Sequence, residues 1–156
     1  MQRVERALAA AGVSAEVRSF PAGTRTAQDA AAAVGVEVGQ IVKSLVFARP
    51  GSGRPLLVLV SGANRADEAL LRDAAGEPVA RADAELVRRA TGFAIGGVPP
   101  VGHAEPLETL VDEDLLRHEC VWAAAGTPSE VFAIAPDDLV RATGGRVVAV
   151  RSAGAR

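Results

Sequence analysis

The 156-residue sequence predicts a mixed α/β fold, arranged as a single compact domain over residues 1–156. Three observations support this prediction. Short capped amphipathic segments alternate along the chain with short aliphatic runs. Hydrophobic residues make up 49% and charged residues 23%, which is typical of a folded domain with a sizeable core. We find no internal repeat, low-complexity tract or interdomain linker, so one domain is expected.

Helices are predicted where a capping residue precedes an apolar stripe and a glycine follows it. Thr26 caps the segment 27–34, Asp29 adds a weak capping box, and Gly35 ends the helix. The predicted helices are 4–11, 27–34, 66–74, 83–90 and 136–143. A further helical turn is expected at 112–116, where acidic residues suit the N-terminal end of the helix dipole.

Strands are predicted from short apolar runs bounded by turn residues. The runs 41–47 and 56–60 flank a turn at 50–55, Pro-Gly-Ser-Gly-Arg-Pro, so we expect an antiparallel hairpin at a central, doubly covered place in the sheet. Further strands are expected at 15–20, 109–111, 120–124, 131–135 and 146–150, with a short extended piece at 78–80.

Charge and cysteine content limit the possible partners and the compartment. The net charge of −2 gives no global attraction for phosphate backbones, so any nucleic-acid contact must come from a local arginine patch or from one end of the nucleic acid. The single cysteine, Cys120, excludes an internal disulfide and fits a reducing compartment. No signal peptide or membrane-spanning run is present, so we expect a cytoplasmic protein without a membrane partner.

A loop at residues 91–103 is the most informative stretch of the chain. It contains four glycines and two adjacent prolines, but most of its other residues are apolar. Glycine allows close approach of the backbone, and proline stiffens it. We therefore expect a packed loop that presents backbone groups to a ligand. A tight crossover between two elements is the alternative.

Lys43 is the one lysine among seventeen basic residues, the others being arginines. Its compact, rotatable ammonium differs from the planar arginine fork, and it lies inside an apolar run. Buried charges need partners, so such a residue belongs to a strand end, a rim or a pocket. We favour a pocket, because function is the commoner reason for an ionisable group among apolar residues. A solvent-facing lysine on an edge strand is the alternative.

Familiar catalytic signatures are absent. The chain contains no phosphate-binding loop, no dinucleotide glycine pattern and no Gly-x-Ser-x-Gly elbow. His103 and His118 lie in different segments, without a cysteine or an acid at ligand spacing. We therefore expect neither a metal nor another cofactor.

Four segments together resemble the YbaK/EbsC family, the free-standing relatives of the editing domain inserted in bacterial prolyl-tRNA synthetase. They are Ile41-Val-Lys-Ser-Leu-Val-Phe47, Val60-Ser-Gly-Ala-Asn-Arg-Ala-Asp67, residues 90–103 and Ala125-Gly-Thr-Pro128. The resemblance extends from about residue 4 to residue 150. It implies a mixed, mostly antiparallel, barrel-like sheet surrounded by helices. It also implies a trans-editing hydrolase that deacylates mischarged aminoacyl-tRNA.

The same resemblance assigns the site residues. Lys43 matches the active-site lysine beside the terminal adenosine and the ester, and Ser44 matches a small polar residue of the amino-acid pocket. The loop that holds the substrate near its carbonyl corresponds to Gly96, Gly97, Val98, Pro99 and Pro100. A segment facing the pocket corresponds to Gly126, Thr127 and Ser129, and we add Phe20 and Thr24 as lining candidates. Some relatives carry a histidine where this chain has Ser129, and nothing makes His103 a base.

The expected substrate is a small amino acid such as Cys, Ala or Ser on tRNA-Pro or a related tRNA, bound through the acceptor end. Arg25, Arg65 or a partner synthetase are candidates to assist this recognition. Two alternatives remain open. One is a non-catalytic module that binds an aminoacyl-adenosine-like ligand or a synthetase, and the other is a structural or regulatory interaction protein.

Overall fold

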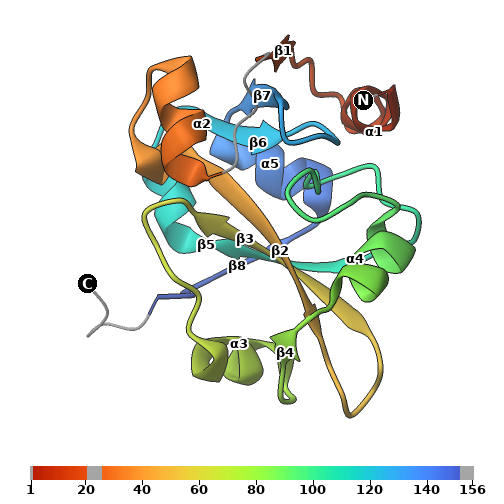
Figure 1. Ribbon diagram of the computed structural model, residues 1–156. Coiled ribbons are helices and arrows are strands. Elements are labelled where there is room, and N and C mark those ends of the chain that lie inside the picture. The colour runs from red at the N-terminus through yellow and green to blue at the C-terminus, as the bar shows by residue number, and fades with distance from the viewer. Residues whose placement is uncertain (1, 21–25, 152–156) are drawn as a thin grey trace.

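The computed structural model describes residues 2–20 and 26–151, in which the strands form two sheets (Figure 1). The helices are α1 (Gln2–Ala10), α2 (Ala27–Val34), α3 (Glu68–Ala75), α4 (Ala84–Thr91) and α5 (Pro136–Thr143), with 3-10 helices η1 (Val38–Gln40) and η2 (Glu113–Arg117). The strands are β1 (Val17–Ser19), β2 (Val42–Ala48), β3 (Pro55–Ser61), β4 (Ala80–Arg81), β5 (Glu108–Asp112), β6 (Val121–Ala124), β7 (Glu130–Ile134) and β8 (Arg146–Val148). The predicted α/β class and order of elements are confirmed.

Helix ends follow the capping residues. The Thr26 hydroxyl accepts a hydrogen bond from the amide of Asp29 at 3.0 Å, and Gly35 ends α2 in the left-handed conformation at φ 77°. Both α2 and α5 have the predicted bounds. The turn predicted at 112–116 is the 3-10 helix η2, which Asp112 caps.

The larger sheet has the strand order β4-β2-β3-β5-β8. β2 and β3 form the predicted antiparallel hairpin, whereas β3, β5 and β8 run parallel. β3 is covered on both faces, as predicted. Leu57 and Leu59 face a core shared with α1, α5 and the smaller sheet, while Leu56 and Val58 face a second core beside α3.

The smaller sheet has the order β1-β7-β6, with antiparallel pairs only. Of the six strand pairings in the two sheets, four are antiparallel, so the mixed and mostly antiparallel character is confirmed. The expectation of a barrel-like sheet needs a correction, since the two sheets do not close. Ile41, the residue before β2, forms one parallel bridge with Trp122 of β6, and no ladder continues from it in the described chain.

Candidate active site

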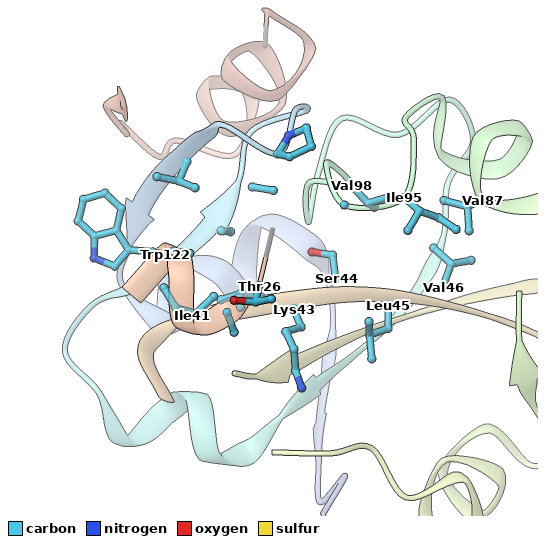
Figure 2. A pocket seen from close by; sticks show the side chains of 18 of the residues that line it. Thr26, Ile41, Lys43, Ser44, Leu45, Val46, Val87, Ile95, Val98 and Trp122 are labelled. Carbon is cyan, nitrogen blue, oxygen red and sulfur yellow. The ribbon is translucent and has the colours of Figure 1, made fainter. Parts of the chain in front are cut away.

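A cavity of about 320 Å³ lies along β2, where α2, β6 and the glycine-proline loop approach it (Figure 2). Most of its lining is apolar. The lining side chains that carry nitrogen or oxygen are those of Thr26, Lys43, Ser44, Arg81 and Trp122. No carboxylate, imidazole or thiol lines it among the residues that the structure describes. The cavity can therefore position an ester and its carbonyl, but it offers no ordinary protein base.

Consecutive residues of β2 contribute to the cavity from opposite faces of the strand. Ser44 projects toward the loop segment of Ile95 and Val98, whereas Lys43 and Leu45 project the other way (Figure 2). This follows from the two-residue period of a strand. All of these residues line the same cavity because it lies along the strand. The lysine and the loop thus share one site, although the ammonium and the Ser44 hydroxyl are on different sides of β2.

The Lys43 ammonium donates a hydrogen bond to the backbone carbonyl of Asn64 at 2.5 Å. Burial lowers the pKa of Lys43, and the nearby cations Arg81 and Arg65 lower it further, while Asp112 acts in the opposite direction. Among the described residues, no ion pair to a carboxylate involves Lys43, Arg65 or Arg81. Three cations, Lys43, Arg65 and Arg81, thus lie near one another on this side of β2, with Asp112 as a nearby anion.

A buried carboxylate holds the lysine's partner in place, and sequence reasoning missed it. Asp112 is 1% exposed and accepts hydrogen bonds from the amide of Ser61 at 3.0 Å and the side-chain amide of Asn64 at 2.8 Å. The Asn64 side chain also donates to Asp114 at 2.8 Å. These contacts fix the turn whose carbonyl binds Lys43. The sequence indicated only that Asp112 suits a helix N-terminus.

The Ser44 hydroxyl is buried and has no hydrogen-bond partner. Buried hydroxyls normally find a partner, and leaving one unpaired costs about 1–3 kcal/mol. Above it, Val98 is buried and Gly96 takes a φ of 94°, a conformation that favours glycine. The hydroxyl is therefore an unpaired polar group buried in the wall of the cavity.

The loop over the cavity, residues 92–103, is called the roof loop, and it packs against residues 126 and 127. A Cβ on Gly97 would lie 2.8 Å from both the carbonyl oxygen of Gly126 and the Cα of Thr127, so the two segments are in close backbone contact. The amide of Gly97 donates to the carbonyl of Ala94 at 3.1 Å, so it is not available to a ligand. Gly96 and Val98 remain as candidate backbone donors.

His103 belongs to the roof loop and does not line the cavity. Its Nε2 lies 2.7 Å from the carbonyl oxygen of Pro99, which a neutral imidazole with hydrogen on Nε2 can donate to. Burial lowers the pKa of His103, although the bond to Pro99 opposes the shift. This contact indicates a structural role for His103. The residue also lines a second cavity, together with Pro100 and Thr109.

The structure brings together part of the predicted site. Lys43, Ser44, Gly96 and Val98 line the cavity, and Gly97, Gly126 and Thr127 support it from behind. Four other candidates do not line it: Phe20, Pro99, Pro100 and Ser129. Thr24 and Arg25 lie outside the described residues.

Phe20 and Ser129 instead join β1 to the end of the β6–β7 turn. The Phe20 amide donates to the Ser129 carbonyl at 2.8 Å, and the Phe20 ring packs in the cluster of Trp122 and Val131. Sequence reasoning missed Thr26, Arg81 and Trp122 as lining residues. In the sequence, Thr26 was recognisable only as a helix cap, and neither Arg81 nor Trp122 belongs to a recognisable motif.

Within residues 2–20 and 26–151, no group of three or more His, Cys, Asp or Glu side chains is placed to hold a metal ion. No helix in the described part of the chain is long and apolar enough to cross a membrane.

Comparison with known proteins identifies the family of this chain. The chain matches the aminoacyl-tRNA editing domain family over residues 21–142. It is similar to a crystal structure of a candidate trans-editing enzyme for prolyl tRNA synthetase, with a TM-score of 0.91 and 50% identity, covering 97% of this chain and 96% of the other. An uncharacterised protein of Bacillus subtilis, YwhH, is 30% identical over 80% of this chain and 78% of its own length.

A further relative comes from Enterococcus faecalis. It is EbsC, named as a candidate Cys-tRNA(Pro)/Cys-tRNA(Cys) deacylase, and it is 25% identical over 78% of this chain and 74% of its own. The resemblance to the YbaK/EbsC family and the predicted fold are confirmed by these matches. This chain belongs to the aminoacyl-tRNA editing domain family.

Proposed function

We propose that this protein is a trans-editing aminoacyl-tRNA deacylase, which hydrolyses the ester between a small amino acid and a mischarged tRNA. One observation carries the assignment. Lys43 and Ser44, adjacent on β2, both line a single cavity beside the roof loop, and the Ser44 hydroxyl buried in its wall has no hydrogen-bond partner. The family match and the similarity to a candidate trans-editing enzyme support the same activity.

The chemistry suits a cavity without a protein base. Water adds to the ester carbonyl, the bond to the ribose oxygen breaks, and the products are a free amino acid and a tRNA with a free terminal hydroxyl. An aminoacyl ester is already activated, so the protein needs to position the reactants and to stabilise the oxyanion. Gly96 and Val98 are candidate donors, and the family resemblance implies help from the substrate's own ribose hydroxyl or thiol.

The substrate's nucleic-acid part is proposed to bind at its acceptor end. The net charge of −2 argues against a broad phosphate-binding surface. Lys43 and Arg81 line the cavity, Arg65 acts electrostatically on Lys43, and none of the three makes an ion pair in the described chain. We propose that Lys43 and Arg65 face the terminal nucleotides, that a synthetase assists delivery, and that the reaction takes place in the cytoplasm without a metal or other cofactor.

The amino acid is proposed to be small, with Cys, Ala and Ser as the candidates and tRNA-Pro or a related tRNA as the carrier. The Ser44 side of the cavity is narrowed by Val46, Val98 and Ala123. A pocket of this kind distinguishes one methylene by only about 1–3 kcal/mol. Discrimination between these amino acids therefore depends on few contacts.

A second candidate is a non-catalytic module that binds an aminoacyl-adenosine-like ligand. One observation favours it: the described lining contains no acid, imidazole or thiol. The two candidates make different predictions about turnover, so one assay separates them.

The test is a deacylation assay with a panel of tRNAs charged with Ala, Ser, Cys, Thr or Pro. We expect release of one small amino acid well above the spontaneous rate, while prolyl-tRNA-Pro stays intact. Lys43→Met is the matched control, because it keeps an unbranched side chain of nearly the same length and removes the charge. Binding of an aminoacyl-adenosine analogue without turnover of any charged tRNA would instead establish the binding module.

A further inference from the structure

The edge of β2 facing the cavity is not paired over its middle part. β2 pairs with β3 through its whole length, with Ile41 opposite Gly62, whose amide donates to the Ile41 carbonyl at 2.7 Å. In an antiparallel ladder such hydrogen-bonded pairs alternate with pairs whose backbone groups point outward. The N–H and C=O of Ser44 therefore point away from β3.

Two contacts mark the ends of this open edge. At one end is the bridge of Ile41 with Trp122, and at the other the Ala82 amide donates to the Val46 carbonyl at 3.1 Å. Between them, no strand pairs with β2 on this side in the part of the chain that the structure describes. Ser44 lies at the middle of the gap.

The edge of β6 that faces β2 is also unpaired at Ala124. The Ala125 amide donates to the Glu130 carbonyl at 2.8 Å, which makes residues 125 and 130 a hydrogen-bonded pair of the β6–β7 ladder. By alternation, the backbone groups of Ala124 point away from β7. Ala124 and Ser44 both line the cavity. The cavity thus lies where β2 and β6 diverge, so that the two sheets do not close into a barrel.

We propose that the open edge of β2 at Ser44 binds the aminoacyl group of the substrate as a one-residue antiparallel strand. The Ser44 C=O accepts a hydrogen bond from the substrate's α-ammonium, and the Ser44 N–H donates to the ester carbonyl. An α-aminoacyl group carries the same donor and acceptor as a residue in a hydrogen-bonded pair, so the two sets match. This inference rests on the proposed deacylase function.

The pairing also fixes the direction of the substrate. The antiparallel sense places the ester oxygen and the nucleoside toward Thr26 and Trp122, and the ammonium toward Ala82. Residues directly opposite each other in an antiparallel pair put their side chains on the same face. The substrate's side chain therefore lies beside the unpaired hydroxyl of Ser44 and under Val98.

The decisive variant replaces the Ser44 backbone N–H by an ester oxygen, with glyceric acid incorporated at position 44 so that the side chain is kept. We expect kcat/KM to fall by about 100-fold, as for loss of one oxyanion donor, with little change in the thermal unfolding midpoint. Phe47 is the matched control. It is paired with Leu56 in the ladder, and its N–H points into β3. Phenyllactic acid there should lower the unfolding midpoint and leave kcat/KM nearly unchanged.

A second measurement does not need turnover. The probes are 3′-alanylamino-3′-deoxyadenosine, a stable amide, and its propionyl analogue, which lacks the ammonium. Wild-type protein should bind the alanyl probe about 10-fold more tightly, and the position-44 ester should weaken that binding. Equal affinity for both probes, or full kcat/KM in the position-44 ester, would overturn the inference. If the wild type binds the alanyl probe more tightly, as expected, but does not deacylate any charged tRNA, the proposed function is refuted and the binding inference stands.

Discussion

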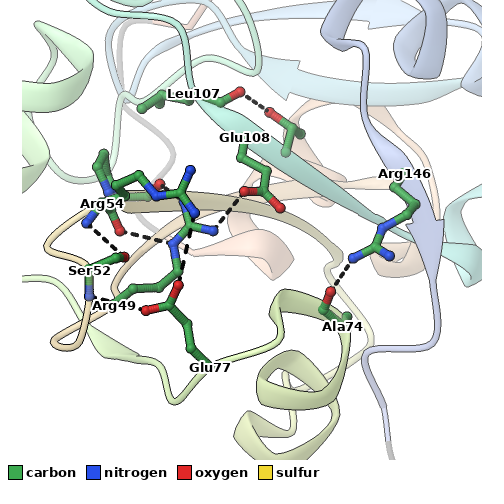
Figure 3. A network of polar contacts seen from close by, with 10 residues as sticks. Arg49, Ser52, Arg54, Ala74, Glu77, Leu107, Glu108 and Arg146 are labelled. Atoms are coloured by element: carbon green, nitrogen blue, oxygen red, sulfur yellow. Dashed lines mark hydrogen bonds and ion pairs between the residues drawn. The ribbon is translucent and has the colours of Figure 1, made fainter.

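Buried polar groups are fully paired at one end of the β2–β3 hairpin and unpaired at the other. At the turn end, Arg49 is 2% exposed, and its guanidinium donates to Glu108 at 2.7 Å and to the carbonyls of Arg54 and Pro55 at 3.1 and 2.8 Å (Figure 3). At the cavity end, the Ser44 hydroxyl is buried without a partner and the strand edge is unpaired.

This difference separates stability from function within one hairpin. Buried polar groups that are fully paired hold a fold together, whereas unpaired ones reduce its stability unless a ligand completes them. The hydrogen bond from Arg49 also holds the pKa of Glu108 below its usual range. We therefore expect changes at the turn end to affect unfolding, and changes at the cavity end to affect the reaction.

The largest effect is expected for Lys43→Ala. Because the ammonium is the charged group of the cavity that is anchored to Asn64, its loss should lower kcat/KM by about 100-fold or more while the fold stays intact. Single-turnover deacylation with circular dichroism as the folding control measures this. Full activity in this variant would contradict the assigned site.

The same residue gives a pH test. The pKa of folded Lys43 is lowered, so the unfolded state holds its proton to higher pH. The free energy of unfolding should therefore rise as pH increases from the folded pKa toward the ordinary lysine value. Activity that needs the ammonium should fall over the same range. Lys43→Met should remove this contribution to the slope, and an unchanged slope would mean that the lysine is not buried as described.

At the opposite end of the hairpin, Arg49→Met should reduce the free energy of unfolding by about 2 kcal/mol, because two backbone carbonyls lose their donor. Urea denaturation measures the loss. Activity below the unfolding transition should be nearly that of the wild type. A large fall in kcat/KM without destabilisation would show that the two ends of the hairpin are not separate in function.

A smaller effect is expected for Gly97→Ala in the roof loop. The added methyl would lie 2.8 Å from backbone atoms of Gly126 and Thr127, so the loop must move away from its support. We expect kcat/KM to fall by about 10-fold, consistent with displaced backbone donors, and only a small loss of stability. Gly53→Ala, in the distant hairpin turn, controls for a general glycine effect; equal loss of activity in both variants would contradict this explanation.

The smallest effect on the reaction is expected for His103→Gln, which keeps a donor for the Pro99 carbonyl. Deacylation near pH 7.5 should change by less than about 3-fold, since His103 does not line the cavity. Because burial lowers the pKa of His103, the unfolded state takes up this proton first as pH falls. As pH falls from the ordinary histidine pKa to the lower folded value, the free energy of unfolding of the wild type should thus decrease. The variant should not show this decrease.

Local elements of the fold were predictable because their causes are local. The bounds of α2 and α5 follow from Thr26, Pro136 and the glycines after each helix, and the doubly covered β3 follows from its unbroken apolar run. Lys43 stood out by its residue type among apolar neighbours. Phe20 and Ser129 do not line the cavity in the described structure, because their distance from it depends on how the smaller sheet packs.

The sequence by itself determined the helices, the hairpin, the loop and the family, since caps, periodicity and motifs are written in neighbouring residues. The tertiary structure decided where the barrel stays open, which amide of the roof loop is already occupied, and that Asp112 fixes the carbonyl that holds Lys43. The physical reason is that the open edge and the Asp112 contacts depend on segments far apart in the sequence, such as Ile41 with Trp122 and Asn64 with Asp112. The Gly97 hydrogen bond depends on how the loop folds against residues 126 and 127. Only the packed chain determines which of its backbone groups remain free for a substrate.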